Sequence, residues 1–152
     1  MGLIHNIYTA PIVHQVRCGP ECLIVIKYNN RTYKGCAITH PDDEEFFSEK
    51  IGYSIALSRA RIQILKDEKK RLRQEYIDKM RLYNDVLGYG TKKPEEIDPT
   101  GAFKKNIDKT LHRYFTVAEV LEEEQEGLKT YLKGQNTFIE KLKAYREKDK
   151  MN

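Results

Sequence analysis

The residues of this sequence best suited to chemistry are cations and aromatic rings that gather in two stretches. Arg59 and Arg61 form the first stretch, and Phe103, Lys105 and Arg113 lie in the second. A guanidinium group donates paired hydrogen bonds to a phosphate, and an aromatic ring offers a face on which a nucleobase stacks. We predict that these five residues bind a nucleotide, with the arginines and the lysine on phosphate and Phe103 stacking.

A structural role is the competing interpretation of each of these residues. Aromatic side chains are more often buried in a core than stacked on a ligand. The cluster as a whole favours binding more than any one residue does, because Lys104, His112, Tyr114 and Phe115 add cations and rings beside a predicted loop.

Catalytic and metal-binding chemistry have less support. The sequence has no nucleophile elbow, glycine-rich phosphate loop or HExxH motif, so we predict no enzyme activity and no cofactor. The strand region holds histidines and cysteines (His14, Cys18, Cys22, Cys36 and His40). They lack the closely spaced pairs of structural zinc modules, so we predict no metal site.

Composition restricts the possible partners. A third of the residues are charged and 39% are apolar, and the net charge of +4 is too small to indicate nucleic-acid binding by itself. No apolar run approaches the roughly 18 residues that span a bilayer, and the first residues do not resemble a secretion signal. Three cysteines, an odd number, favour reduced thiols in a cytosol.

The elements that position the cluster begin with a small sheet, which we place in residues 1–41. Partly alternating or continuous apolar runs predict strands near 12–17, 22–28 and 31–39, with the second strand in the centre. Asn29 and Asn30 suit a tight hairpin turn because asparagine tolerates a positive φ. The result is a three-stranded antiparallel meander with one face that needs a cover.

A long helix over residues 43–88 is predicted to supply this cover. Pro41, Asp42 and Asp43 suit its start, and Gly88 or Gly90 its end. Small residues near its start permit close approach to the sheet: Gly52, Ala56 and Ala60. Two series of residues at seven-residue intervals form its seam: Ile51, Ser58, Leu65 and Leu72, and Ile55, Ile62, Lys69, Tyr76 and Tyr83.

Residues 89–115 are predicted to form a loop with a short helix, and residues 116–148 a second long helix. Thr116 and Glu119 suit a capping box at its start. Its seam advances in steps of four and three from Val117 to Tyr145, interrupted by Glu124 and Gln135. Two glycines beside this seam, Gly127 and Gly134, cost about 1 kcal/mol each relative to alanine but allow tight contact.

Together these patterns predict a single domain over residues 1–152. The fold class is α+β, with an N-terminal three-stranded antiparallel sheet packed on two long antiparallel helices. Because the two seams extend beyond one small sheet, we expect a second copy of the chain to cover the rest. The protein is therefore predicted to be a homo-oligomer, a dimer or larger.

A stretch of about thirty residues resembles a pattern in small phage and prophage proteins. It consists of Gly35-Cys36-Ala37, His40-Pro41-Asp42, Phe46 or Phe47, Ile51-Gly52, Ile55-Ala56 and Arg59-Ala60. In this order it is similar to the type-one Thoeris anti-defence proteins. These phage oligomers sequester the cyclic ADP-ribose isomer made by a bacterial TIR-domain sensor, and some members also hold cyclic oligonucleotides.

The resemblance implies a viral protein of the host bacterial cytoplasm that binds a small nucleotide signal without turnover. It also implies phosphates held by arginines, adenine stacked on an aromatic ring and a pocket shared between protomers. It does not extend to the ligand residues, so the five candidates rest on chemistry alone. Two alternatives stay open: a phage host-takeover protein that inhibits a host protein through its helix faces, and a weak nucleic-acid binder. We expect no membrane partner.

Overall fold

The computed structural model describes residues 2–46 and 48–151. By its internal contacts the chain divides into two compact units: unit 1 comprises residues 1–64 and 122–152, and unit 2 comprises residues 65–121. Its elements, in chain order, are α1 (Leu3–Tyr8), β1 (Ile12–Cys18), β2 (Glu21–Tyr28), β3 (Arg31–Ile38), the 3-10 helix η1 (Pro41–Phe46), α2 (Glu49–Val86), α3 (Pro94–Ile97) and α4 (Ala102–Met151). Of the described helices, none combines the length and the hydropathy needed to cross a membrane.

The predicted α+β class and the three-stranded meander are confirmed. The strands pair antiparallel in the order β1-β2-β3, with Ile24 of β2 opposite Gln15 on one side and Gly35 on the other. Asn29 and Asn30 both have positive φ, 49° and 60°, as the hairpin turn requires. Strand β2 is the most buried, with alternate residues facing the core: Cys22, Ile24, Ile26 and Tyr28.

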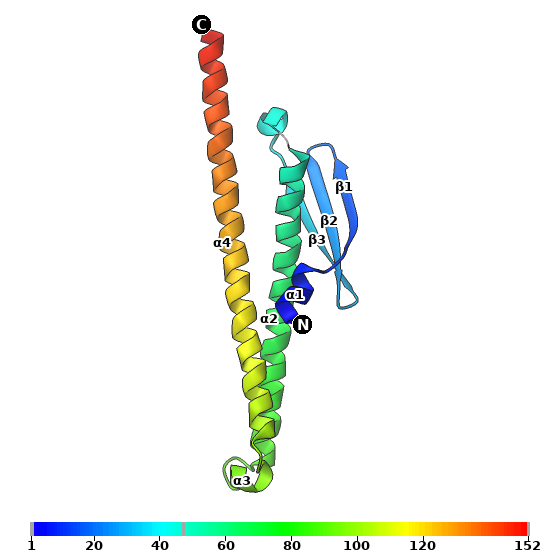
Figure 1. Cartoon of the computed structure of the whole chain (residues 1–152), viewed down its shortest axis with the longest axis vertical. Helices are drawn as coiled ribbons and strands as arrows, with labels where there is room; N and C mark the ends of the chain where they lie inside the picture. The colour runs from blue at the N-terminus through cyan, green and yellow to red at the C-terminus, as the bar shows by residue number, and fades with distance from the viewer. Residues whose placement is uncertain (1, 47, 152) are drawn as a thin grey trace. The chain divides into compact units, whose positions relative to one another are not determined.

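One face of the sheet packs on the first turns of α2, where small residues replace large ones. Gly35 is buried, and a Cβ atom added to it would overlap the carbonyl oxygen of Ala56 and lie 2.7 Å from the backbone nitrogen of Ala60. Ala56 and Ala60 are themselves fully buried. The close approach predicted from these small residues is therefore confirmed. Within unit 1, the sheet lies on one side of this part of α2 and α4 lies on the other (Figure 1).

The start of the first long helix differs from the prediction of residue 43. Pro41–Phe46 form the 3-10 helix η1, and α2 begins at Glu49, where Ser48 Oγ accepts a hydrogen bond from the nitrogen of Ile51 at 3.4 Å. The acids of η1 pair with cations of α4 instead: Asp43 with Lys143, and Glu45 with Arg146 at 2.6 Å. The guanidinium of Arg146 also lies over the ring of Phe46. Phe47, named in the sequence pattern, lies outside the described residues.

The predicted loop and helix start between residues 89 and 116 are partly wrong. α4 is one helix of 50 residues that begins at Ala102, so there is no break near Tyr114. Thr116 does not cap a helix, because its hydroxyl donates to the carbonyl oxygen of His112 one turn earlier. A threonine inside a helix can donate its hydroxyl hydrogen bond to the carbonyl oxygen one turn earlier. The presence of threonine therefore does not by itself mark the start of a helix.

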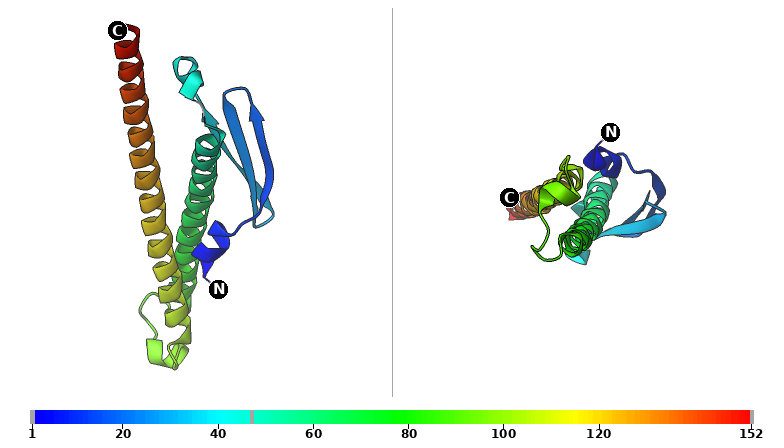
Figure 2. Two further views of the ribbon diagram at one scale, coloured as in Figure 1. Left: turned by 45° about the horizontal axis from the view of Figure 1, so that its top comes forward. Right: turned by 90° about the horizontal axis from the view of Figure 1, so that it is seen from below.

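Unit 2 is an antiparallel helical hairpin formed by the end of α2 and the start of α4. α2 ends at Val86, and Gly88 has φ of 59°, which confirms the predicted glycine stop near this position. The short helix α3 lies in the connection between α2 and α4 (Figure 2). In unit 1, the short N-terminal helix α1 has no counterpart among the predicted elements; it contributes Ile7, which is 1% exposed, to the core.

Candidate functional site

The five candidate residues fall in different units of the chain. Arg59 and Arg61 lie on the part of α2 that belongs to unit 1, whereas Phe103, Lys105 and Arg113 lie on the part of α4 that belongs to unit 2. The structure thus groups the two arginines with the sheet and the other three residues with the helical hairpin.

In unit 1 the two arginines bind backbone carbonyl groups. Arg59 Nη1 donates to the carbonyl oxygen of Cys36 on β3 at 2.7 Å. Arg61 Nη2 donates to the carbonyl oxygen of Tyr8 at 3.3 Å, and its guanidinium carbon lies 4.8 Å from the centre of the Tyr8 ring. Both arginines therefore connect α2 to neighbouring elements. A guanidinium has five N–H donors, so each side chain keeps donors beyond these bonds.

Glu124 of α4 joins three elements of unit 1. Its Oε2 accepts a hydrogen bond from the Tyr8 hydroxyl at 2.6 Å, and its Oε1 accepts one from the Ser58 hydroxyl at 2.7 Å. Ser58 is one of two polar interruptions in the first predicted seam and Glu124 is one of two in the second, and here they are partners. The carboxylate thus links α1 and α2 to α4. Its hydrogen bond to Ser58 replaces the apolar contact that the seam pattern predicts at these two positions.

The Tyr8 hydroxyl titrates abnormally because of this contact. Burial and the hydrogen bond to the Glu124 carboxylate raise the pKa of Tyr8 above its ordinary value of 10.0. The unfolded chain therefore releases this proton at a lower pH than the folded chain. The folded state then binds more protons than the unfolded state above about pH 10, so stability falls as pH rises.

We expect the stability advantage of the wild-type protein over Tyr8→Phe to be constant below about pH 9 and to shrink above about pH 10. The loss has an upper limit of about 1.4 kcal/mol per pH unit, reduced by solvent screening of the partly exposed ring. Urea unfolding of both proteins between pH 8 and pH 11 measures it. An advantage that stays constant through pH 11 would contradict the Tyr8–Glu124 contact.

A small hollow in unit 1 lies beside this network. It has a volume of about 200 Å³ and lies between Ser54 and Ser58 of α2 and the 123–131 stretch of α4. Both Glu123 and Glu124 line it. Drug-sized ligands occupy pockets of roughly 300–1,000 Å³. Two carboxylates in a hollow below that size do not suit the phosphates of a nucleotide.

In unit 2, Phe103 is held at the start of α4. The carboxylate of Asp98 accepts hydrogen bonds from the backbone nitrogens of Phe103 and Lys104, at 3.3 and 3.2 Å, which caps the helix. The Phe103 ring is half-buried against Tyr83 of α2, with ring centres 5.2 Å apart and planes tilted by 53°. One face of Phe103 is therefore already in contact with another ring.

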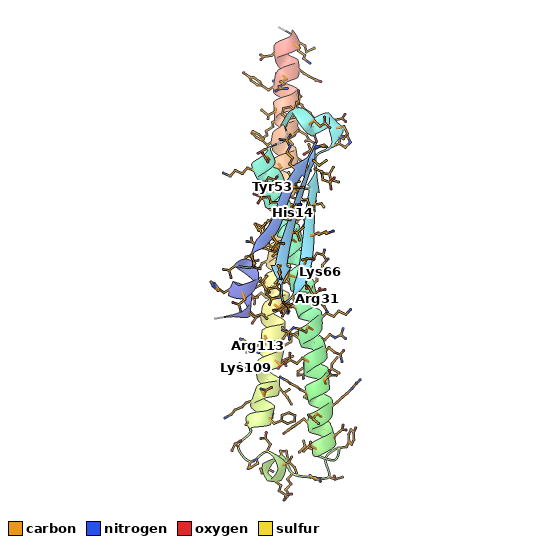
Figure 3. The ribbon with its side chains drawn as sticks, turned by 90° about the vertical axis from the view of Figure 1, so that its right-hand side faces the viewer. His14, Arg31, Tyr53, Lys66, Lys109 and Arg113 are labelled. Atoms are coloured by element: carbon orange, nitrogen blue, oxygen red, sulfur yellow. The ribbon has the colours of Figure 1, made fainter. Side chains whose placement is uncertain are left out.

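Lys105 and Arg113 belong to a row of exposed cations on α4. Together with Lys109, which the sequence analysis did not single out, they recur every fourth residue, so they lie on one helical face. We call Lys105, Lys109 and Arg113 the cationic row. Lys109 and Arg113 are one turn apart in Figure 3. The four-residue spacing was visible in the sequence and could have identified Lys109.

The helix that carries this row is held to α2 by polar contacts. Lys79 Nζ donates to Asn106 Oδ1 at 2.6 Å and to the hydroxyl of the buried Thr110 at 2.9 Å. Lys79 also pairs with Glu75 at 2.9 Å. The hydrogen bond from Lys79 lowers the pKa of Glu75, and the charge of Arg113 adds to this shift. The cationic row therefore lies on a fixed hairpin rather than on a loop.

Comparisons of the chain with protein-family models, with curated proteins and with solved structures found no match. Among residues 2–46 and 48–151, there is also no group of three or more histidine, cysteine, aspartate or glutamate side chains that could hold a metal ion. The geometry of the candidate residues is therefore the basis for assigning a function.

Proposed function

We propose that this protein captures an anionic nucleotide by binding it without turnover, with the cationic row of α4 on its phosphates. The observation that carries the proposal is the row itself, three exposed cations at four-residue intervals on a helix that Lys79 joins to α2 through Asn106 and Thr110. Helical rows of Lys and Arg present several donors to one chain of phosphates. Phe103 and Tyr114 are both half-exposed in the same unit, and on this proposal a base stacks on a ring face that Tyr83 or Lys69 leaves open.

The resemblance to the type-one Thoeris anti-defence proteins supplies the ligand class for this proposal. The ligand is then a cyclic nucleotide immune signal, either a cyclic ADP-ribose isomer or a cyclic oligonucleotide. On this proposal the protein is made by a phage, acts in the host bacterial cytoplasm, has no catalytic activity and works as a homo-oligomer. Sequestration needs tight binding and no bond cleavage, in keeping with the absence of catalytic motifs from the sequence.

Support for phosphate binding is stronger at the cationic row than at the two arginines of unit 1. Arg59 and Arg61 already donate to the carbonyl oxygens of Cys36 and Tyr8. The hollow of unit 1 has neither arginine in its lining and carries two carboxylates, Glu123 and Glu124. On this proposal, Arg59 and Arg61 bind phosphate only through the N–H donors that do not bond to these carbonyl oxygens.

Arg113→Ala is expected to weaken nucleotide binding by about 1.5–3 kcal/mol, as for loss of a charged hydrogen bond, and to leave the fold intact. Titration calorimetry with cyclic ADP-ribose isomers and cyclic di- and trinucleotides measures the change. Lys129→Ala is the matched control, because Lys129 is also an exposed cation on α4 but lies in unit 1. Equal affinities for the wild-type protein and Arg113→Ala would remove Arg113 from the site.

A second candidate function is inhibition of a host protein through the helix faces. It is favoured by exposed aromatic side chains on α4, among them Phe138, which is 58% exposed, and Tyr145, which is 68% exposed. An inhibitor of this kind would retain one host protein in a pull-down and would show no thermal shift with nucleotides. A weak nucleic-acid binder, the third alternative, would lose affinity steeply with added salt.

A further inference from the structure

The part of α4 that belongs to unit 1 has little packing to hold it in place. The buried side chains of this helix end at Leu121, and residues 122–151 are half-buried or exposed throughout. Most of the stability of a helix in a protein comes from packing of an apolar face. Contacts of another kind must therefore hold this part of α4 to the rest of unit 1.

Helix α2 does not reach the end of α4. Ser58 of α2 donates to Glu124 of α4, and α2 begins nine residues before Ser58, at Glu49. Because the two helices run antiparallel with the same rise per residue, the start of α2 lies level with about residue 133 of α4. The last turns of α4 extend past this point, beside η1 (Figure 1).

The 3-10 helix η1 holds these last turns through three polar contacts. Lys143 Nζ donates to the carboxylate of Asp43, and Arg146 Nη1 lies 2.6 Å from Glu45 Oε2. The guanidinium carbon of Arg146 also lies 4.9 Å from the centre of the Phe46 ring. Among the described residues, no other side-chain hydrogen bond, ion pair or ring contact joins the last turns of α4 to another element.

Two glycines of α4 precede this contact with η1. Gly127 and Gly134 are exposed, and a Cβ atom added to either meets nothing within 4 Å. The tight contact that the sequence predicted at these two positions is therefore not made in the folded chain. Glycine inside a helix lowers its stability relative to alanine, because its backbone loses more conformational freedom. The helix is therefore easiest to unwind just before the turns that η1 holds.

We propose that η1 is an electrostatic clasp and that residues 135–151 open as a separate unit when its two ion pairs break, while the rest of the fold stays intact. Opening removes the Arg146 guanidinium from the Phe46 ring and frees the cations of both ion pairs. Exposed ion pairs are individually weak and are screened by salt, so the clasp opens as ionic strength rises. Segments that move are drawn from the least stable parts of a fold.

Hydrogen exchange of the full-length protein, followed by mass spectrometry, measures this opening. We expect exchange of residues 135–147 to quicken by about 10-fold in the double variant Asp43→Asn with Glu45→Gln, because both ion pairs are lost. Strand β2 should keep its protection. Raising NaCl from about 50 mM to about 500 mM should quicken exchange of the same residues in the wild type and have little effect in the double variant.

Asp42→Asn with Glu44→Gln is the matched control, because it removes the same charge from η1 but neither ion pair to α4. It should change the exchange by less than about 2-fold. Gly134→Ala should slow exchange of residues 135–147 by about 5-fold, and no slowing would overturn Gly134 as the point of opening. Wild-type exchange in the Asp43 and Glu45 variant, equal acceleration in the control, or simultaneous loss of protection in β2 would each overturn the clasp.

Discussion

Gly35→Ala is expected to destabilise the protein by about 3 kcal/mol or more, the largest loss that we expect from a single methyl group. The added Cβ would overlap the carbonyl oxygen of Ala56 and press on the backbone nitrogen of Ala60. Neither neighbour is the flexible end of a side chain. The sheet and α2 must therefore separate locally, which disrupts the packing that buries Ile24 and the rest of the inner face.

Urea unfolding followed by circular dichroism measures this loss. Lys34→Ala is the appropriate control, because Lys34 is the adjacent residue of β3 and is exposed to solvent. Its replacement is expected to change the free energy of unfolding by less than about 0.5 kcal/mol. If Gly35→Ala were as stable as Lys34→Ala, the close packing of β3 on α2 would be wrong.

Glu124→Ala is expected to lower the free energy of unfolding by about 2–4 kcal/mol. The substitution removes two hydrogen bonds to a charged acceptor, and it leaves the partly buried hydroxyls of Tyr8 and Ser58 without that acceptor. Each charged hydrogen bond contributes about 1.5–3 kcal/mol, and partial exposure reduces the total. These two hydrogen bonds join α1 and α2 to the part of α4 that belongs to unit 1.

Glu123→Ala provides the comparison, because Glu123 is the adjacent carboxylate and is exposed. It changes the local charge by the same amount, so a difference between the two variants reports the hydrogen bonds of Glu124 and not the loss of an acidic side chain. Glu124→Gln should fall between them, since an amide keeps one acceptor. Equal stabilities of Glu123→Ala and Glu124→Ala would show that the network does not hold α4 in place.

The sheet was predictable because each of its features is set by local sequence. The aliphatic run of β2 and the Asn29-Asn30 turn specify strand and hairpin without reference to distant residues. The close approach of α2 was also predictable, since Gly35, Ala56 and Ala60 are small. The start of α2 was placed too early, because the acids after Pro41 were interpreted as a helix N-terminus and instead pair with cations of α4 about a hundred residues later.

Pairings between distant residues limited the rest of the prediction. Ser58 and Glu124 each interrupt a seam, and only the folded chain shows that the two interruptions hydrogen-bond to each other. The break expected before Thr116 depended on a capping preference that the hydroxyl satisfies within the helix. The hydrogen bonds of Arg59 and Arg61 to the carbonyl oxygens of Cys36 and Tyr8 also join residues that are distant in the sequence, so the sequence did not indicate them. Lys109, in contrast, followed from spacing alone and was overlooked.

Capture without turnover is tested most directly by recovering the ligand. The purified protein is mixed with a cyclic ADP-ribose isomer, separated from free nucleotide and then denatured by heat, and the released nucleotide is identified by mass spectrometry. We predict that intact nucleotide is recovered from the wild-type protein and that much less is recovered from a variant in which Lys105, Lys109 and Arg113 are replaced by alanine. Release of a cleaved product, or no retention of this isomer or of cyclic di- and trinucleotides, would contradict the proposed function.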